Sequence, residues 1–181
     1  MTVDLSAIAK WPNVPACYNW LSLDRRGQWR LQGERLTHGG LINFINRQYA
    51  CDESGSWFVQ NGPQRVFVEL AYTPWVFHFY AAELISHTGE QAGQPETCYL
   101  DEEGSVLIKT SMGIGLLDDR DLSVFFDDCR NQDNAAVDES DWGKIIAGDS
   151  TVKIAWRELP LNFIRKNEVA CRFNFQTDPQ G

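Results

Sequence analysis

The sequence predicts an α+β fold made of two tandem repeated motifs, each an antiparallel sheet with one helix, packed as one globular unit. Two observations predict this fold. Turn, strand and helix patterns follow one another in the same order in both halves of the chain. Within each half, one helical stripe of apolar residues stands between short runs of β-branched and aromatic residues. A length of 181 residues with 43% hydrophobic residues suits one such domain or two very small ones.

The repeat begins with a pair of matching turns. Leu23–Gly27 and Leu100–Gly104 both read Leu-Asp, two further residues and Gly. Both segments are expected to be hairpin turns, because Asp can bond its own downstream backbone and Gly accepts positive φ at no steric cost. A strand-like run follows each turn, Trp29–Leu31 in the first half and Val106–Ile108 in the second.

The later part of each copy is aligned through a glycine, a strand-like run and a proline. The offset between the copies widens from 77 residues (Asp24 to Asp101) to 86 (Pro74 to Pro160), which requires a few loop insertions. The paired features are Gly55 with Gly143, Val66–Leu70 with Val152–Trp156, and Pro74 with Pro160.

One helix is predicted in each copy. The first is expected to start at a Thr37 N-cap and to run to about Gln48, with Leu41, Phe44 and Ile45 on one stripe. The second is expected to be capped by Asp118 or Asp119. Its apolar stripe consists of Leu122, Phe125, Phe126 and Cys129.

These signals divide the chain into five parts. The segment 87–97 contains Gly89, Gly93 and Pro95 and is expected to be the linker between the copies. A last strand is expected at Cys171–Phe175. The predicted parts are an N-terminal segment 1–19, a first repeat 20–86, the linker 87–97, a second repeat 98–175 and a tail 176–181.

Charge and hydropathy exclude two classes of partner. The chain carries 16 Lys and Arg against 25 Asp and Glu, a formal net charge of −9, so this acidic protein is expected to be repelled by nucleic acid. No apolar run approaches the length of a membrane span, and residues 1–11 lack the pattern of a signal peptide. The five cysteines are widely spaced and are expected to be free, which favours a cytoplasmic location.

One string of residues resembles an uncharacterised proteobacterial family, a domain of unknown function. The segment 57–66, Trp-Phe-Val-Gln-Asn-Gly-Pro-Gln-Arg-Val, is the most specific part of the likeness, which covers roughly residues 20–128. A related uncharacterised family has Thr-Pro-x-Glu in place of Gly62-Pro63-Gln64. That resemblance implies two copies of an α+β motif and a ligand-binding or signalling role, without any activity. The relative is acidic before Pro74 where this chain has Ala71–Thr73, so any role of those acids cannot be transferred.

The Asn61–Arg65 segment is the strongest candidate for a binding site. Asn-Gly followed by Pro predicts a rigid hairpin loop. Arg65 beside Gln64 could hold a carboxylate or phosphate, or could pair with one of the many acidic side chains. We expect this loop at the rim of the main concave surface, with aromatic rings and His38 nearby. The predicted ligand-binding residues are His38, Trp29, Trp57, Asn61, Gln64 and Arg65.

No metal or cofactor is expected. The three histidines share no i, i+4 spacing, and Gly113-Ile114-Gly115 lacks the third glycine of a dinucleotide fingerprint because Asp118 occupies that place. The acidic run from Asp118 to Asp141 lacks the spacing of a calcium loop.

These patterns favour a non-enzymatic cytoplasmic module, a monomer or homodimer, that binds a small anionic ligand or a protein partner in signalling or regulation. No catalytic signature is assembled, so an enzyme is the less favoured class. The first alternative is a hydrolase or transferase that uses scattered carboxylates and His38. The second is a structural homo-oligomer built through exposed strand edges.

Overall fold

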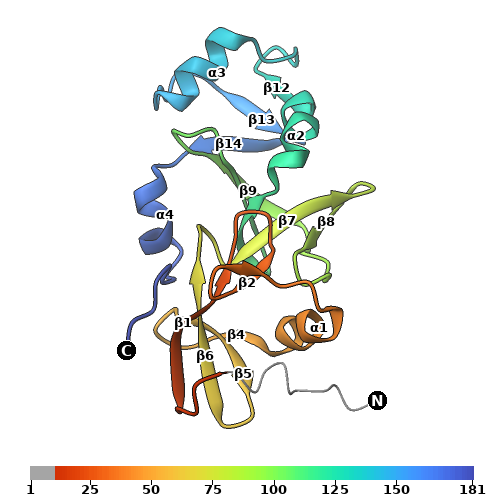
Figure 1. Cartoon of the computed structure of the whole chain (residues 1–181). Coiled ribbons are helices and arrows are strands. Elements are labelled where there is room, and N and C mark those ends of the chain that lie inside the picture. The colour runs from red at the N-terminus through yellow and green to blue at the C-terminus, as the bar shows by residue number, and fades with distance from the viewer. Residues whose placement is uncertain (1–10) are drawn as a thin grey trace. The chain divides into compact units, whose positions relative to one another are not determined.

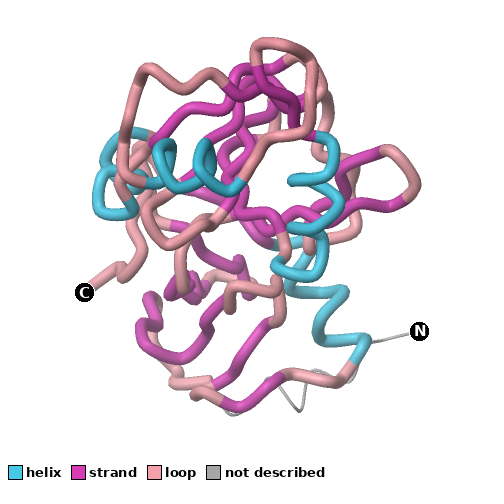
Figure 2. Tube along the Cα trace, turned by 90° about the horizontal axis from the view of Figure 1, so that it is seen from above, coloured by secondary structure: helices cyan, strands magenta, loops and turns pink. Residues whose placement is uncertain are grey.

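Two β-sheets organise residues 11–181, which are the residues that the computed structural model describes (Figure 1). The chain divides into two compact units. Unit 1 contains the described residues up to Pro74 together with Asn174–Gly181, and unit 2 contains Trp75–Phe173. Helices and strands both occur along the described residues (Figure 2), with two sheets and four α-helices in the element order, so the predicted α+β class is confirmed. No helix within residues 11–181 is both long and apolar enough to cross a membrane.

Unit 1 holds a six-stranded sheet in the order β3-β2-β1-β6-β5-β4. The two central strands, β1 and β6, are parallel, and the other neighbours are antiparallel. Helix α1 contacts β5 and buries Leu41 and Ile45. The elements are β1 (Ala16–Leu23), β2 (Trp29–Leu31), β3 (Glu34–Arg35), α1 (Gly39–Gln48), β4 (Tyr49–Cys51), β5 (Trp57–Asn61) and β6 (Gln64–Leu70).

Unit 2 holds an eight-stranded sheet in the order β12-β13-β14-β9-β10-β11-β7-β8. Two of its neighbouring pairs are parallel, β14 with β9 and β11 with β7. The strands are β7 (Trp75–Tyr80), β8 (Glu83–Ser86), β9 (Pro95–Leu100), β10 (Val106–Thr110), β11 (Gly113–Leu117), β12 (Cys129–Asn131), β13 (Ile154–Trp156) and β14 (Leu159–Phe163). The helices are η2 (Asp119–Asp121), α2 (Leu122–Asp128), α3 (Glu139–Ile146) and α4 (Lys166–Arg172).

The predicted duplication appears as one topology used twice. Strands β1 to β6 run three strands, one helix and three strands, and β9 to β14 repeat this order with η2 before α2 and with α3 added between β12 and β13. Both copies place the last strand beside the first. The last strand of each copy runs parallel to the first. The sheets are therefore mixed, whereas purely antiparallel sheets were predicted.

The second copy carries an inserted helix, α3, and our sequence alignment of the two copies is wrong by one strand after it. Gly143 lies in α3, which is inserted between β12 and β13, and so does not match the turn glycine Gly55. The run Val152–Trp156 leads into β13, the counterpart of β5, whereas Val66–Leu70 lies in β6. Pro160 lies within β14, the counterpart of β6.

Three further expectations are corrected by the structure. Residues 75–86, assigned to the first repeat, form β7 and β8, and β7 pairs with β11 of unit 2. Cys171–Phe175 contains no strand, because α4 runs to Arg172 and a turn follows it. The N-cap of α1 is His38 and not Thr37, because the imidazole accepts the Leu41 N–H. Part of the predicted segment 1–19 lies outside the described residues.

Four hairpin turns share one hydrogen-bonded motif. In each, a side-chain oxygen accepts the backbone N–H groups two and four residues later, and the fourth residue has positive φ. This is the turn chemistry that Asp, Asn and Gly favour. The acceptor and positive-φ residues are Asp24 with Gly27, Asp52 with Gly55, Asp101 with Gly104, and Asn131 with Asn134.

The eight-stranded sheet curls so that distant strands meet. Strands β7 and β13 are far apart in the sheet order, yet the rings of Phe79 and Trp156 lie 6.0 Å apart. Trp156 is fully buried and also stacks on Phe125 of α2 at 5.0 Å. Its ring therefore forms the centre of the core on this side of unit 2.

His87 follows the edge strand β8 and forms two hydrogen bonds with the backbone of Val76 in β7. The backbone N–H of His87 donates to the Val76 carbonyl at 2.8 Å, and the imidazole Nδ1 accepts the Val76 N–H at 3.3 Å. The ring packs 5.6 Å from Trp75. Burial of the imidazole lowers the pKa of His87 from 6.5 to about 3. The folded protein therefore holds this ring neutral at pH values where an unfolded chain would protonate it.

Loss of the Asp101 carboxylate is expected to destabilise the protein strongly. Asp101 is fully buried, and its Oδ1 accepts the N–H groups of Glu103 and Ser105. Asp101→Ala would leave these donors unpaired at a cost of about 2–3 kcal/mol in the free energy of unfolding, measured with urea. Asp101→Asn keeps the acceptor, as Asn131 does in the fourth turn, and is expected to lose less than half as much. Equal losses in the two variants would contradict this role.

The neutral state of His87 predicts a stability that falls as the solution becomes acidic. Folding lowers the pKa of His87, so below pH 6.5 the unfolded chain binds a proton that the folded protein does not. The contribution of the neutral His87 ring to the free energy of unfolding is therefore complete above pH 6.5 and is lost toward pH 3. Its slope is about 1.4 kcal/mol per pH unit below 6.5. Urea unfolding of the protein and of His87→Phe at pH 7, 6 and 5 checks this. The substitution should flatten the profile, and parallel profiles would show that His87 does not titrate as described.

Candidate functional site

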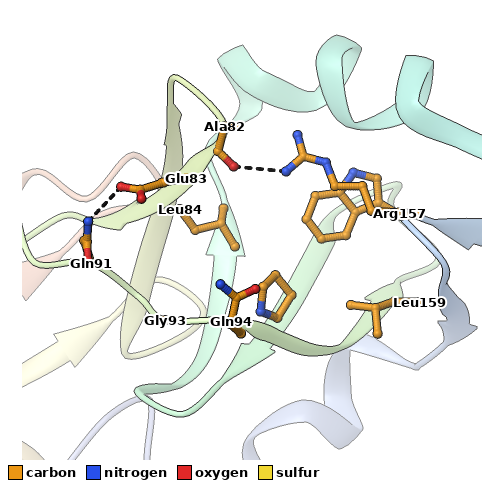
Figure 3. Close-up of a pocket in the computed structure, with 10 residues that line it drawn as sticks. Ala82, Glu83, Leu84, Gln91, Gly93, Gln94, Arg157 and Leu159 are labelled. Carbon is orange, nitrogen blue, oxygen red and sulfur yellow. Dashed lines mark hydrogen bonds between the residues drawn. The ribbon is translucent and has the colours of Figure 1, made fainter.

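The best-formed candidate site is a pocket of about 320 Å³ in unit 2. The β7–β8 hairpin and the segment that leads into β9 form one side, and the β13–β14 hairpin forms the other (Figure 3). The pocket thus lies where the curled sheet brings its ends together. Its lining residues are Ala82, Glu83, Leu84, Gln91, Gly93, Gln94, Pro95, Trp156, Arg157 and Leu159.

Arg157 occupies an unfavourable backbone position. It and Glu158 form the two-residue turn between β13 and β14, with φ values of +46° and +70°. Two positive φ angles are the requirement of a type I′ turn, which Asn-Gly normally supplies. The equivalent hairpin of the first copy has Gly62 at its first central position. The second copy instead places a long cationic side chain here, and backbone strain of this kind clusters at functional sites.

The guanidinium of Arg157 is held from three sides. Its Nε donates to Asp128 Oδ2 at 3.0 Å, and its Nη1 donates to the Ala82 carbonyl at 3.1 Å (Figure 3). The cation also lies over two rings, 4.8 Å from Trp156 and 5.2 Å from Phe79. Cation–π contacts and charge-assisted bonds together fix its position before any ligand arrives.

The other walls supply one acid, amides and apolar surface. Glu83 Oε2 accepts a hydrogen bond from Gln91 Nε2 at 2.7 Å, away from Arg157 in Figure 3. Leu84, Leu159 and Trp156 give the pocket its apolar part. None of the lining residues is Ser, Thr, Cys or His, and Glu83 is the carboxylate among them. Residues 11–181 contain no group of three or more His, Cys, Asp or Glu placed to hold a metal ion.

The first copy has a pocket at the equivalent place. There the β5–β6 hairpin, with Asn61, Pro63 and Gln64, faces the segment 11–15 that leads into β1. Gln64 Nε2 donates to the carbonyls of Pro12 and Val14, both at 2.6 Å, so its amide anchors that segment. Asn61 Nδ2 donates to Gln64 Oε1 at 3.3 Å. The structure therefore brings together two of the six residues predicted to bind a ligand.

Strand register separates Arg65 from the two predicted tryptophans. Val66 pairs with Val59, two residues from Trp57, so Trp57 shares a sheet face with Val66 while Arg65 points to the other face. Trp29 also lies on the Val66 face, because it pairs with Leu23, which pairs with Leu70. The sequence analysis placed Arg65, Trp29 and Trp57 beside one cleft, whereas strand register places Arg65 on the opposite sheet face from the two tryptophans. The sequence pattern could not show this because it does not give the pairing.

Arg65 lies 4.6 Å above the ring of Phe58. Burial raises the pKa of Asp52, but hydrogen bonds from Ser54 and Ser56 and the charge of Arg65 outweigh it. The positive charge of Arg65 therefore contributes to the lowered pKa of Asp52.

The remaining predicted residues have structural contacts in unit 1. His38 is exposed, and its Nδ1 accepts the Leu41 N–H at 3.1 Å, which an anion at this helix end would otherwise take. Trp29 Nε1 donates to Asn46 Oδ1 at 2.7 Å. The Trp29 and Trp57 rings both pack on Tyr49, at 5.1 and 4.6 Å.

Comparison with known proteins places the chain in a family without an assigned activity. Residues 2–180 match the model of DUF2944, which is described as "Protein of unknown function (DUF2946)". The chain belongs to this family. The resemblance expected from the sequence is thereby confirmed. No curated protein matches the DUF2944 chain.

Two solved structures of DUF1285 family proteins are similar to the DUF2944 chain. The one from Silicibacter pomeroyi has a TM-score of 0.54 at 11% identity and covers 85% of this chain and 84% of its own. It shows a shared fold. The one from Shewanella baltica has a TM-score of 0.46 at 16% identity and covers 59% of this chain and 90% of its own.

Replacing Glu158, the second residue of the β13–β14 turn, by glycine is expected to stabilise the protein. Glu158 is exposed and has a φ of +70°. Glu158→Gly removes the Cβ penalty of this conformation and is expected to raise the free energy of unfolding by about 0.5–1 kcal/mol. Glu158→Ala keeps the Cβ and serves as the control without a gain. Urea unfolding of both variants measures the difference, and a loss of stability on Glu158→Gly would show that the turn is not strained.

Proposed function

We propose that the DUF2944 chain is a non-enzymatic bacterial binding protein whose site is the pocket around Arg157, with a small organic carboxylate as its ligand. The observation that carries the proposal is the guanidinium fixed on a positive-φ turn at the pocket. A group held rigidly by its neighbours is what an anchoring contact requires. Free cysteines throughout residues 11–181 support a reducing, cytoplasmic location.

Arg157 has capacity for a further acceptor. Its hydrogen bonds to Asp128 and Ala82 use two of the five N–H donors of the guanidinium. Its partner Asp128 is 40% exposed, and an exposed ion pair contributes about 0–1 kcal/mol. A ligand carboxylate can therefore join or replace Asp128 at little cost. Leu159 and Pro95, which are partly exposed in the pocket, then favour an apolar body on the same ligand.

The pocket also offers a basis for regulation. The Arg157–Ala82 hydrogen bond joins the β13–β14 turn to the β7–β8 hairpin. A ligand bound between these hairpins would tighten or loosen that connection. Such a ligand-dependent link is what a sensor requires.

The sheet edges favour this proposal over a structural oligomer. Short return segments cover part of both edge strands of unit 2, through the bridges Ile85 to Gln91 and Arg130 to Ala136. The edge strand β3 of unit 1 is the charged pair Glu34–Arg35. Short, charged or covered edges oppose pairing with a second copy.

A matched pair of probes tests the proposed site. Phenylacetate and phenylacetamide share an apolar ring and differ in charge, and binding is measured by calorimetry and by NMR shifts. We expect phenylacetate to bind more tightly, and Arg157→Gln to weaken its affinity about tenfold, since charge-assisted bonds contribute about 1.5–3 kcal/mol.

Two arginine variants serve as controls. Arg172→Gln removes a guanidinium that lies over Tyr99 outside the pocket and should leave binding unchanged. Arg65→Ala tests the site predicted at the Asn61–Arg65 loop. Loss of binding in Arg65→Ala with unchanged binding in Arg157→Gln would transfer the site to unit 1 and overturn the proposal.

A further inference from the structure

A second cavity in unit 2, of about 580 Å³, shares no lining residue with the Arg157 pocket. It lies between the ends of β12, β13 and β14 and the segment that follows α3. We infer that this cavity binds an anionic amphipath, a carboxylate head with an unbranched apolar tail. Two cations and an apolar wall point to this ligand.

The two cations come from neighbouring segments. Arg130 of β12 pairs with Ala155 of β13, and Lys153 stands immediately before β13 begins at Ile154. Both residues line the cavity. An anionic head can therefore contact both.

Among the residues that the structure describes, the hydrogen bonds of both cations go to backbone carbonyls and not to a carboxylate. Arg130 Nη1 donates to the carbonyls of Asp127 and Cys129 at 2.6 and 2.7 Å, and Lys153 Nζ donates to the Ser150 carbonyl at 2.8 Å. Within residues 11–181, no Asp or Glu forms an ion pair with either one. The chain has 25 acidic residues, so two neighbouring unpaired cations are an unusual local excess of positive charge.

One acid also lines the cavity. Asp149 Oδ1 accepts hydrogen bonds from the Thr151 N–H and hydroxyl, at 2.9 and 2.6 Å. These bonds lower the pKa of Asp149, with the hydroxyl bond as the largest cause, and so keep it charged. Two cations against one satisfied carboxylate leave the cavity with a net positive charge.

Apolar side chains provide the place for a tail. Ile145, Val152, Ile154, Leu161 and Phe163 all line the cavity. The positive-φ residue Gly148 brings the loop after α3 to the Phe163 ring, where an added Cβ would lie 3.4 Å from its nearest atom. The volume falls in the range of about 300–1,000 Å³ that small-ligand sites occupy.

Octanoate, 1-octanol and butyrate are the probes, and affinity is measured by calorimetry. We expect octanoate to bind at least tenfold more tightly than either 1-octanol, which lacks the charge, or butyrate, which lacks most of the tail. Arg130→Gln and Lys153→Gln should each weaken the affinity for octanoate roughly tenfold. Ala155→Phe, which adds a ring to a lining residue, should reduce binding further.

Controls separate this site from folding effects and from the Arg157 pocket. Lys144→Gln removes a cation paired with Asp141 outside the cavity, and it should bind octanoate normally. The octanoate measurements are made in the Arg157→Gln protein, because octanoate belongs to the ligand class proposed for the Arg157 pocket. Octanoate binding that persists in this protein and is lost on adding Arg130→Gln or Lys153→Gln reports the second cavity alone, so this inference and the proposed function can fail separately. Lys153 is exposed, so its variant is expected to fold, as circular dichroism will check. Equal affinity for octanoate and 1-octanol, or unchanged octanoate affinity in both cation variants, would overturn the inference.

Discussion

The parallel pairing of the first and last strands of each copy is the constraint on which the rest of the structure depends. β1 lies beside β6, and β9 lies beside β14. Because these strands run in the same direction, the hairpin before the last strand and the segment before the first strand meet at one end of the sheet. A hollow forms at this place in both copies. The candidate site is therefore a consequence of topology, and its chemistry depends on which side chains occupy the hairpin.

The copies have filled this equivalent place differently. In the first copy, Gln64 holds the segment before β1 through two short hydrogen bonds. In the second, Arg157 is held by Asp128, by the Ala82 carbonyl and by two aromatic rings. A neutral anchor and a fixed cation on one scaffold are what divergence after duplication would produce.

Several structural features follow from local chemistry and could be predicted from the sequence. The Asp24 and Asp101 turns, the helical stripe of Leu41 and Ile45, and the Asn61–Gln64 hairpin all rest on contacts within a few residues. The resemblance to an uncharacterised family also holds, over residues 2–180. The alignment of the copies failed after the second helix, because the inserted α3 contains a glycine at a position that matched Gly55.

The sequence by itself determined the α+β class, the duplication and the hairpin beside which a pocket forms, since short-range patterns encode turns and strands. Only the tertiary structure decided which side chains share a surface. Strand register places Arg65 and Trp57 on opposite sheet faces, although they are eight residues apart in the chain. The curl of the second sheet brings Arg157 to Ala82 across 75 residues. Pairing and curl arise from long-range packing of whole strands, which no local spacing records.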